Sequence, residues 1–121
     1  LPRALREAGR VLRPGGVLLF DTIDRSLISF VVGIVGAEYI VRIINKGSHD
    51  WRLFIRPEEL RRAAVSAGFD PPTHEAFQPS ARALLELSLF SAGLLDAGRM
   101  VGGWSIGPPT FGMISYIGHT T

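Results

Sequence analysis

The sequence contains no cysteine and almost no excess of either charge. Without cysteine, disulfides, thiolate catalysis and Cys-ligated zinc or iron-sulfur sites are excluded, so we expect a reducing, cytoplasmic setting. The net charge is only +2, and the arginines are dispersed over several segments instead of forming one basic tract. This distribution predicts no nucleic-acid partner.

The sequence also lacks the signatures of several common sites. It has no glycine-rich phosphate loop, P-loop or serine elbow, because Gly15 and Gly16 lead into a predicted strand instead of a helix. His49, His74 and His119 lie far apart and do not have the spacing of metal ligands. We therefore predict no metal site in this chain.

No apolar run is long enough to cross a bilayer. Residues 27–44 form the most hydrophobic segment and predict a helix, but its charge-free part ends at Ala37, short of the roughly 20 residues that a spanning helix needs. Two interpretations stay open: the helix packs on the sheet, or it inserts partly into a membrane interface. In the second, the membrane contacts are Phe30, Val31, Ile34 and Val35. Glu38 and Arg42 have the four-residue spacing of an ion pair and are expected on the opposite side of this helix from Ser29.

What is present is a helix, a turn and a strand within the first twenty residues. Apolar residues recur at steps of three and four from Leu1 to Leu12, which predicts an amphipathic helix. Pro14 ends that helix, and the continuous apolar run of residues 17–20 predicts a strand buried on both faces, as in a parallel α/β sheet. The chain thus opens inside an α/β unit, and we expect the natural domain to begin upstream.

Later segments predict further helices and strands. Pro57 begins a helix that Gly68 ends. Residues 69–77 are polar, carry a Pro-Pro pair and predict only a short edge strand. A helical pattern resumes at residue 79, and alternation over residues 111–117 predicts a final strand.

The polar loop of residues 45–51 holds the strongest candidate for catalysis. His49 is a candidate general base, with Asp50 as its orienting carboxylate, because imidazole titrates near neutrality. The opposing interpretation is a solvated loop histidine, since adjacent residues rarely form such a dyad directly. Asp24 follows the first strand, where open α/β sheets bind ligands, although such residues also cap turns.

Four motifs, taken together, resemble one enzyme family. They are Arg-Val-Leu-Arg-Pro-Gly-Gly-Val-Leu-Leu-Phe-Asp-Thr-Ile-Asp-Arg (10–25), Val-Gly-Ala-Glu-Tyr-Ile-Val-Arg (35–42), Lys-Gly-Ser-His-Asp-Trp (46–51) and Phe-Ile-Arg-Pro-Glu-Glu-Leu (54–60). The first alone indicates only a class I S-adenosylmethionine-dependent methyltransferase. The set resembles the C-terminal half of the ubiquinone-biosynthesis O-methyltransferase family, as does the closing segment 111–119.

The resemblance implies an α/β fold. Residues 1–121 would form the C-terminal part of a methyltransferase domain, a partial Rossmann-like fold whose mostly parallel sheet ends in an antiparallel strand. An apolar insertion at about residues 26–46 would face the membrane or the substrate. The family's cofactor loop, its acidic ribose ligand and its proposed metal ligands would all precede Leu1, so the cofactor-binding residues stay unassigned.

The resemblance also implies an activity. The intact enzyme would transfer a methyl group from S-adenosylmethionine to a catechol-type hydroxyl of a polyprenylated quinone precursor, and a divalent metal would belong to that intact enzyme. His49 would be the base, Tyr39 and Trp51 would lie against the ring, and Asp24 and Asp50 would be further substrate contacts. Alone, the chain would be inactive.

The same resemblance places the protein at a membrane surface. We expect peripheral attachment at the cytoplasmic side of the inner membrane, or at the matrix side in mitochondria, with other quinone-biosynthesis enzymes as further partners. Two departures matter: Asp24 stands where the family commonly has Asn, and the stretch between Phe77 and Phe111 is longer and more hydrophobic than expected. Two alternatives therefore stay open, a non-enzymatic lipid- or quinone-binding module and a methyltransferase of another lipid or small molecule.

Overall fold

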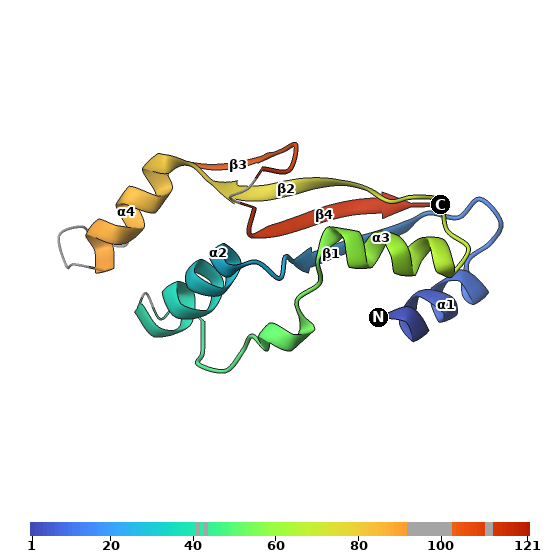
Figure 1. Ribbon diagram of the computed structural model, residues 1–121, viewed down its shortest axis with the longest axis horizontal. Coiled ribbons are helices and arrows are strands. Elements are labelled where there is room, and N and C mark those ends of the chain that lie inside the picture. The colour runs from blue at the N-terminus through green and yellow to red at the C-terminus, as the bar shows by residue number, and fades with distance from the viewer. Residues whose placement is uncertain (41, 43, 92–102, 111–112) are drawn as a thin grey trace.

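The computed structural model describes every residue except 41, 43, 92–102 and 111–112. Its centre is a four-stranded sheet in the order β1-β4-β2-β3 (Figure 1). The strands are β1 (Leu18–Ile23), β2 (Thr73–Pro79), β3 (Trp104–Gly107) and β4 (Ser115–Thr120). The predicted α/β class is confirmed, since helices accompany this sheet.

Every pairing among the described strands is antiparallel. Leu18 lies opposite Thr120, and Thr73 lies opposite His119. Because β4 runs against both β1 and β2, these two strands point the same way but are not neighbours. The antiparallel last strand is confirmed. The prediction of a mostly parallel sheet is wrong for the described strands.

Two helices lie together on one face of the sheet (Figure 1). They are α1 (Pro2–Val11) and α3 (Pro57–Ser66). The amphipathic first helix and the start of α3 at Pro57 are as the sequence predicted. Gly68 follows α3 with a φ of 94°, a left-handed conformation that favours glycine at a helix end. The core between helices and sheet is formed by Leu5, Leu60, Ala64, Phe69, Ala76, Met113 and Tyr116.

The first strand differs from its prediction. Leu18 and Phe20 pack against this core, but Leu19 is 75% exposed and Val17 is 53% exposed. The prediction of burial on both faces is therefore wrong for the described chain. With helices on one face only, residues along an antiparallel strand alternate between core and surface.

Two other strands also depart from the sequence-based prediction. β2 is an interior strand between β4 and β3, so the predicted edge strand is wrong. Pro71 and Pro72 precede β2, where they remove no hydrogen bond from the ladder. The final strand begins at Ser115 instead of residue 111, and the sequence patterns did not predict β3.

The hydrophobic segment after β1 is helical, as predicted. It starts as α2 (Leu27–Ser29), continues as the π-helix η1 (Phe30–Ile40), and ends before residue 44. A single 3-10 turn, η2 (Trp51–Leu53), follows the polar loop. The later helix α4 (Ala81–Ser91) lies where the sequence predicted it, and the rest of its predicted length lies outside the described residues.

Candidate functional site

An apolar hollow of about 780 Å³ lies between η1 and the loop that follows it. Its lining consists of Gly47 and seven of the residues predicted as substrate, membrane or catalytic contacts: Phe30, Ile34, Val35, Tyr39, His49, Asp50 and Trp51. The volume falls in the range of about 300–1,000 Å³ typical of small-molecule sites. The structure thus brings together residues up to 21 positions apart, from Phe30 to Trp51.

Aromatic rings form one side of this hollow. The rings of Phe30 and Trp51 meet edge to face with centroids 5.4 Å apart, and Trp51 lies 5.5 Å from Phe54. Such arrangements are favourable because the edge of one ring carries positive charge toward the negative face of the other. Lys46 lies 5.2 Å from the centroid of the Tyr39 ring, a cation-π contact at the rim.

A buried carboxylate stands behind the hollow. Glu38 is only 1% exposed, and its Oε2 accepts a hydrogen bond of 2.6 Å from the backbone N–H of Gly47. Its Oε1 accepts the backbone N–H of His49 at 2.8 Å and contacts the ring Nδ1 of His49 at 2.8 Å. Burial alone would raise the pKa of Glu38, but the hydrogen bonds from Gly47 and His49 outweigh it, and the pKa is lowered.

Sequence reasoning missed this role of Glu38. It expected Glu38 on the side of the helix away from Ser29, paired with Arg42, and that prediction is wrong. Nine residues are two and a half turns of an α-helix, which would put Glu38 opposite Ser29. The wider turn of the π-helix brings it back to the buried side, where both side chains are covered. A carboxylate within an apolar helix was the available signal, because a buried charge needs partners.

Asp50 does not orient His49. Its carboxylate instead caps η2 by accepting the backbone N–H of Arg52 at 3.0 Å, and it binds the Arg52 guanidinium at 2.8 Å. These hydrogen bonds lower the pKa of Asp50. In place of the predicted pair of His49 and Asp50, the structure therefore pairs His49 with Glu38. Glu38 lies on η1, earlier in the chain.

His49 lies between two hollows. The second, of about 370 Å³, is at the carboxyl end of β1 and is lined in part by Asp21, Thr22, Ser48 and His49. The His49 side chain is 22% exposed, and among the described residues its Nε2 has no hydrogen-bond partner. An imidazole in this position can exchange a proton with a molecule bound beside it.

Asp24 lies apart from both hollows. It is 8% exposed at the end of β1, and its backbone carbonyl accepts a hydrogen bond from the Ser29 hydroxyl. Burial raises its pKa, although Ser26, Arg56 and Arg25 partly offset that effect. The arrangement fits the turn-capping interpretation of Asp24 better than the substrate contact.

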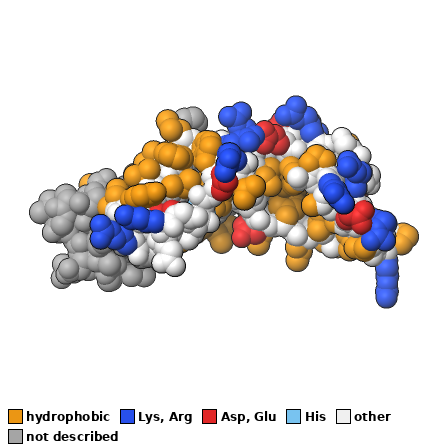
Figure 2. All heavy atoms as spheres, turned by 90° about the horizontal axis from the view of Figure 1, so that it is seen from below, with side chains coloured by type: hydrophobic (Ala, Val, Ile, Leu, Met, Phe, Trp, Pro, Cys, Tyr) orange, Lys and Arg blue, Asp and Glu red, His pale blue; other side chains and the backbone are white. Residues whose placement is uncertain are grey.

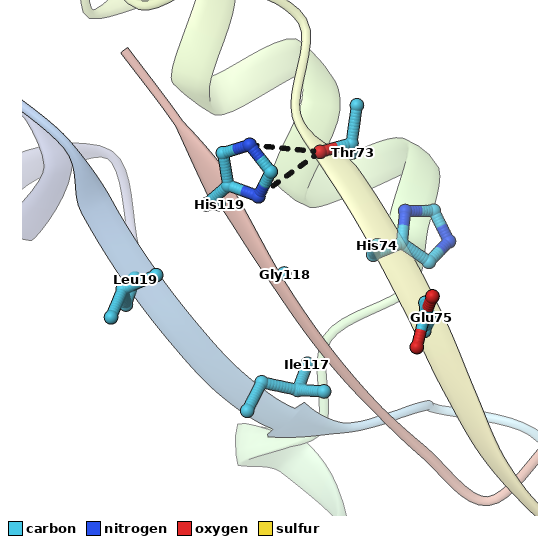
Figure 3. Close-up of a pocket in the computed structure, with 7 residues that line it drawn as sticks. All are labelled: Leu19, Thr73, His74, Glu75, Ile117, Gly118 and His119. Carbon is cyan, nitrogen blue, oxygen red and sulfur yellow. Dashed lines mark hydrogen bonds between the residues drawn. The ribbon is translucent and has the colours of Figure 1, made fainter. Parts of the chain in front are cut away.

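The other two histidines lie on the sheet. Figure 3 shows a hollow on the outer sheet face, where Thr73 and His119 from neighbouring strands lie side by side and form a hydrogen bond. The ring of His74 packs against Tyr116 instead, with centroids 5.1 Å apart. Within the described part of the chain, no group of three or more His, Asp or Glu residues could hold a metal ion.

The outer side of α2 and η1 presents apolar side chains to solvent. Leu27 is 76% exposed, Val31 50% and Ile40 43%. Figure 2 shows hydrophobic side chains gathered over this end of the molecule, with Lys or Arg side chains beside them. None of the described helices combines the length and the apolar character that crossing a bilayer requires.

Known proteins match half of the chain. It is 46% identical over 61 residues to the ubiquinone biosynthesis O-methyltransferase of Dinoroseobacter shibae, and 49% identical over 61 residues to that of Methylococcus capsulatus. The protein of the same name from Methylocella silvestris is 48% identical over 63 residues. These alignments cover 50–52% of the chain and 25–26% of each relative.

The remaining comparisons add no match. No protein-family model and no solved structure matches the chain. The chain spans about a quarter of the length of the curated relatives that it matches. Along about half of its length, the chain is similar to ubiquinone biosynthesis O-methyltransferases. This is the family that its motifs indicated.

Proposed function

We propose that this chain forms the acceptor-binding part of an S-adenosylmethionine-dependent O-methyltransferase that acts on a catechol-type hydroxyl of a polyprenylated quinone precursor. The observation that carries the proposal is the position of His49 in the wall of the apolar hollow. The names of the matching proteins supply the reaction and the pathway.

The hollow suits an aromatic ring with a hydrocarbon tail. Trp51 and Tyr39 offer faces and edges against which a phenol ring can pack. Phe30, Ile34 and Val35 extend the apolar lining along η1, and each buried CH₂ of a tail would gain about 0.8 kcal/mol there.

Methyl transfer to a phenol requires removal of its proton. A phenol resembles tyrosine, whose pKa is about 10, so few molecules are ionised near neutrality. The Nε2 of His49 would accept the hydroxyl proton as the oxygen forms its bond to the methyl carbon. The proton thus passes to His49, and the carbon-sulfur bond of the donor breaks.

S-adenosylmethionine would supply the electrophilic methyl group. The described residues do not form a cradle for it, because no glycine-rich turn among them follows a strand and opens a helix. The residues of this chain would therefore act on the acceptor and its proton. A divalent metal remains part of the proposal for the intact enzyme and has no assigned ligand in this chain.

The exposed apolar side of α2 and η1 would rest in a membrane interface, from which a polyprenylated substrate is drawn. Each of Val31 and Ile40 would gain up to about 1.5–3 kcal/mol on full burial. Lys46 and Arg42, both exposed, would each add about 1 kcal/mol beside anionic lipid. This attachment is peripheral, at the inner membrane, where other quinone-biosynthesis enzymes would be its neighbours.

The test is a methyl-transfer assay on the intact protein that carries this chain, with a polyprenylated catechol as acceptor. We expect His49→Ala to lower kcat by about 10²–10⁴-fold, the usual contribution of a general base. His119→Ala is the matched control, because His119 lies on the outer sheet face. Acceptor binding without methyl transfer in the unmodified protein would contradict the proposal and favour the non-enzymatic quinone-binding module.

A further inference from the structure

Glu38 is a buried carboxylate behind the hollow, and the proposed mechanism leaves it without a task. It takes three hydrogen bonds from one neighbouring loop, two from backbone N–H groups and one from an imidazole. Burying a charged group is costly unless it is paired. Glu38 is paired only with the loop backbone and with His49 among the described residues, so we expect it to position one or both of them.

An ionised carboxylate is an acceptor only. The nitrogen that faces it must therefore carry a hydrogen, which makes Nδ1 of His49 the donor in the 2.8 Å contact with Oε1. A neutral imidazole has one protonated nitrogen, so Nε2 then holds a free lone pair. The lowered pKa of Glu38 keeps the carboxylate ionised near neutrality.

We propose that Glu38 is the positioning residue of His49. It fixes the tautomer protonated at Nδ1 and turns the Nε2 lone pair toward the hydroxyl of an acceptor in the hollow. This inference rests on the proposed function, because the base needs an acceptor to act on. Carboxylates that orient a histidine through its second nitrogen are a recurring device in enzymes.

The loop is built to present these donors. Gly47 has a φ of 81°, a left-handed conformation that glycine adopts without strain. Its N–H reaches Oε2 while the N–H of His49 reaches Oε1, so both carboxylate oxygens are engaged from one side. These hydrogen bonds therefore tie the loop and the imidazole to η1.

The Glu38→Gln variant removes the negative charge of the side chain while keeping nearly the same size and shape. An amide offers one acceptor oxygen and one donor nitrogen, so in either orientation an N–H group of the glutamine faces an N–H group of the loop or the ring. We expect the fraction of His49 protonated at Nδ1 to fall in this variant. The turnover number should fall about 10–100-fold with little change in KM for the acceptor.

The experiment measures ¹⁵N shifts of the imidazole nitrogens in the full chain, and turnover in the intact enzyme. The unmodified protein should show Nδ1 protonated and Nε2 bare, an observation that needs no variant. Glu75→Gln is the control, since Glu75 is exposed on β2. In the Glu75→Gln variant, neither the ¹⁵N shifts of the His49 ring nor kcat should change. Glu38→Asp, which keeps the charge, should restore part of the Nδ1-protonated population.

The outcomes separate the two proposals. A His49 ring protonated at Nε2 in the unmodified protein overturns the role of Glu38, and so does a Glu38→Gln variant with unchanged tautomer and unchanged kcat. If His49→Ala leaves kcat unchanged, the proposed function fails instead, whatever tautomer the ring adopts.

Discussion

The phenolic hydroxyl of Tyr116 donates a 2.9 Å hydrogen bond to the backbone carbonyl of Ile55, 61 positions earlier in the chain. Tyr116 lies on β4, in the middle of the sheet, and is 1% exposed. Its pKa is raised by burial and by the nearby carboxylates of Asp24 and Glu59, so the hydroxyl keeps its proton. The bond ties the segment before α3 to the sheet.

Removing this hydroxyl should destabilise the fold. We expect Tyr116→Phe to lower the free energy of unfolding by about 0.5–1.5 kcal/mol, because the Ile55 carbonyl loses its partner while the ring still packs. Urea unfolding followed by circular dichroism measures this change. Tyr39→Phe is the matched control, since Tyr39 is 51% exposed. Equal midpoints for Tyr116→Phe and the unmodified chain would show that the bond contributes nothing.

The exposed apolar side of η1 should carry membrane attachment. We expect Phe30→Asp combined with Val31→Asp to abolish co-sedimentation with anionic liposomes, because charged groups resist transfer into the interface. Leu19→Asp is the control, since Leu19 is more exposed than Phe30 and Val31 but lies on the sheet. The attachment proposal fails if the double variant sediments as before while its circular dichroism spectrum is unchanged.

Acidification should release the loop from Glu38. The pKa of this carboxyl is lower in the folded chain than its ordinary value of 4.5, so its stabilising contribution is complete above 4.5 and is lost as the pH falls further. We expect the amide proton shifts of Gly47 and His49 to move in that acidic range, as measured by NMR. The same transition persisting in Glu38→Gln would assign it to another group.

The pKa of Asp24 is shifted in the opposite direction to that of Glu38. Burial raises its pKa above the ordinary 3.8, so the folded chain binds this proton more tightly, and stability falls as the pH rises through the raised value. We expect Asp24→Asn to increase the free energy of unfolding near neutrality and to have little effect in acid. Denaturant titrations at the two pH values test this. A variant less stable at neutral pH would mean that the Asp24 charge is favourable where it lies.

Local patterns in the sequence were enough for the elements whose conformation depends on their own residues. Three- and four-residue spacing predicted α1, and Pro57 and Gly68 marked the limits of α3, because proline and glycine act on the backbone where they stand. The motifs also contain most of the residues that line the apolar hollow, since each motif is a short run of neighbouring residues.

Only the tertiary structure decided the rest. The order β1-β4-β2-β3, the interior place of β2 and the one-sided burial of β1 depend on pairings between segments far apart in sequence, which no local period reports. The partnership of Glu38 with His49 likewise required the wide turn of η1, because the α-helical period used to read the sequence points that carboxylate the other way. Side-chain spacing fixes which residues share a face only once the number of residues per turn is known, and here the structure supplies that number.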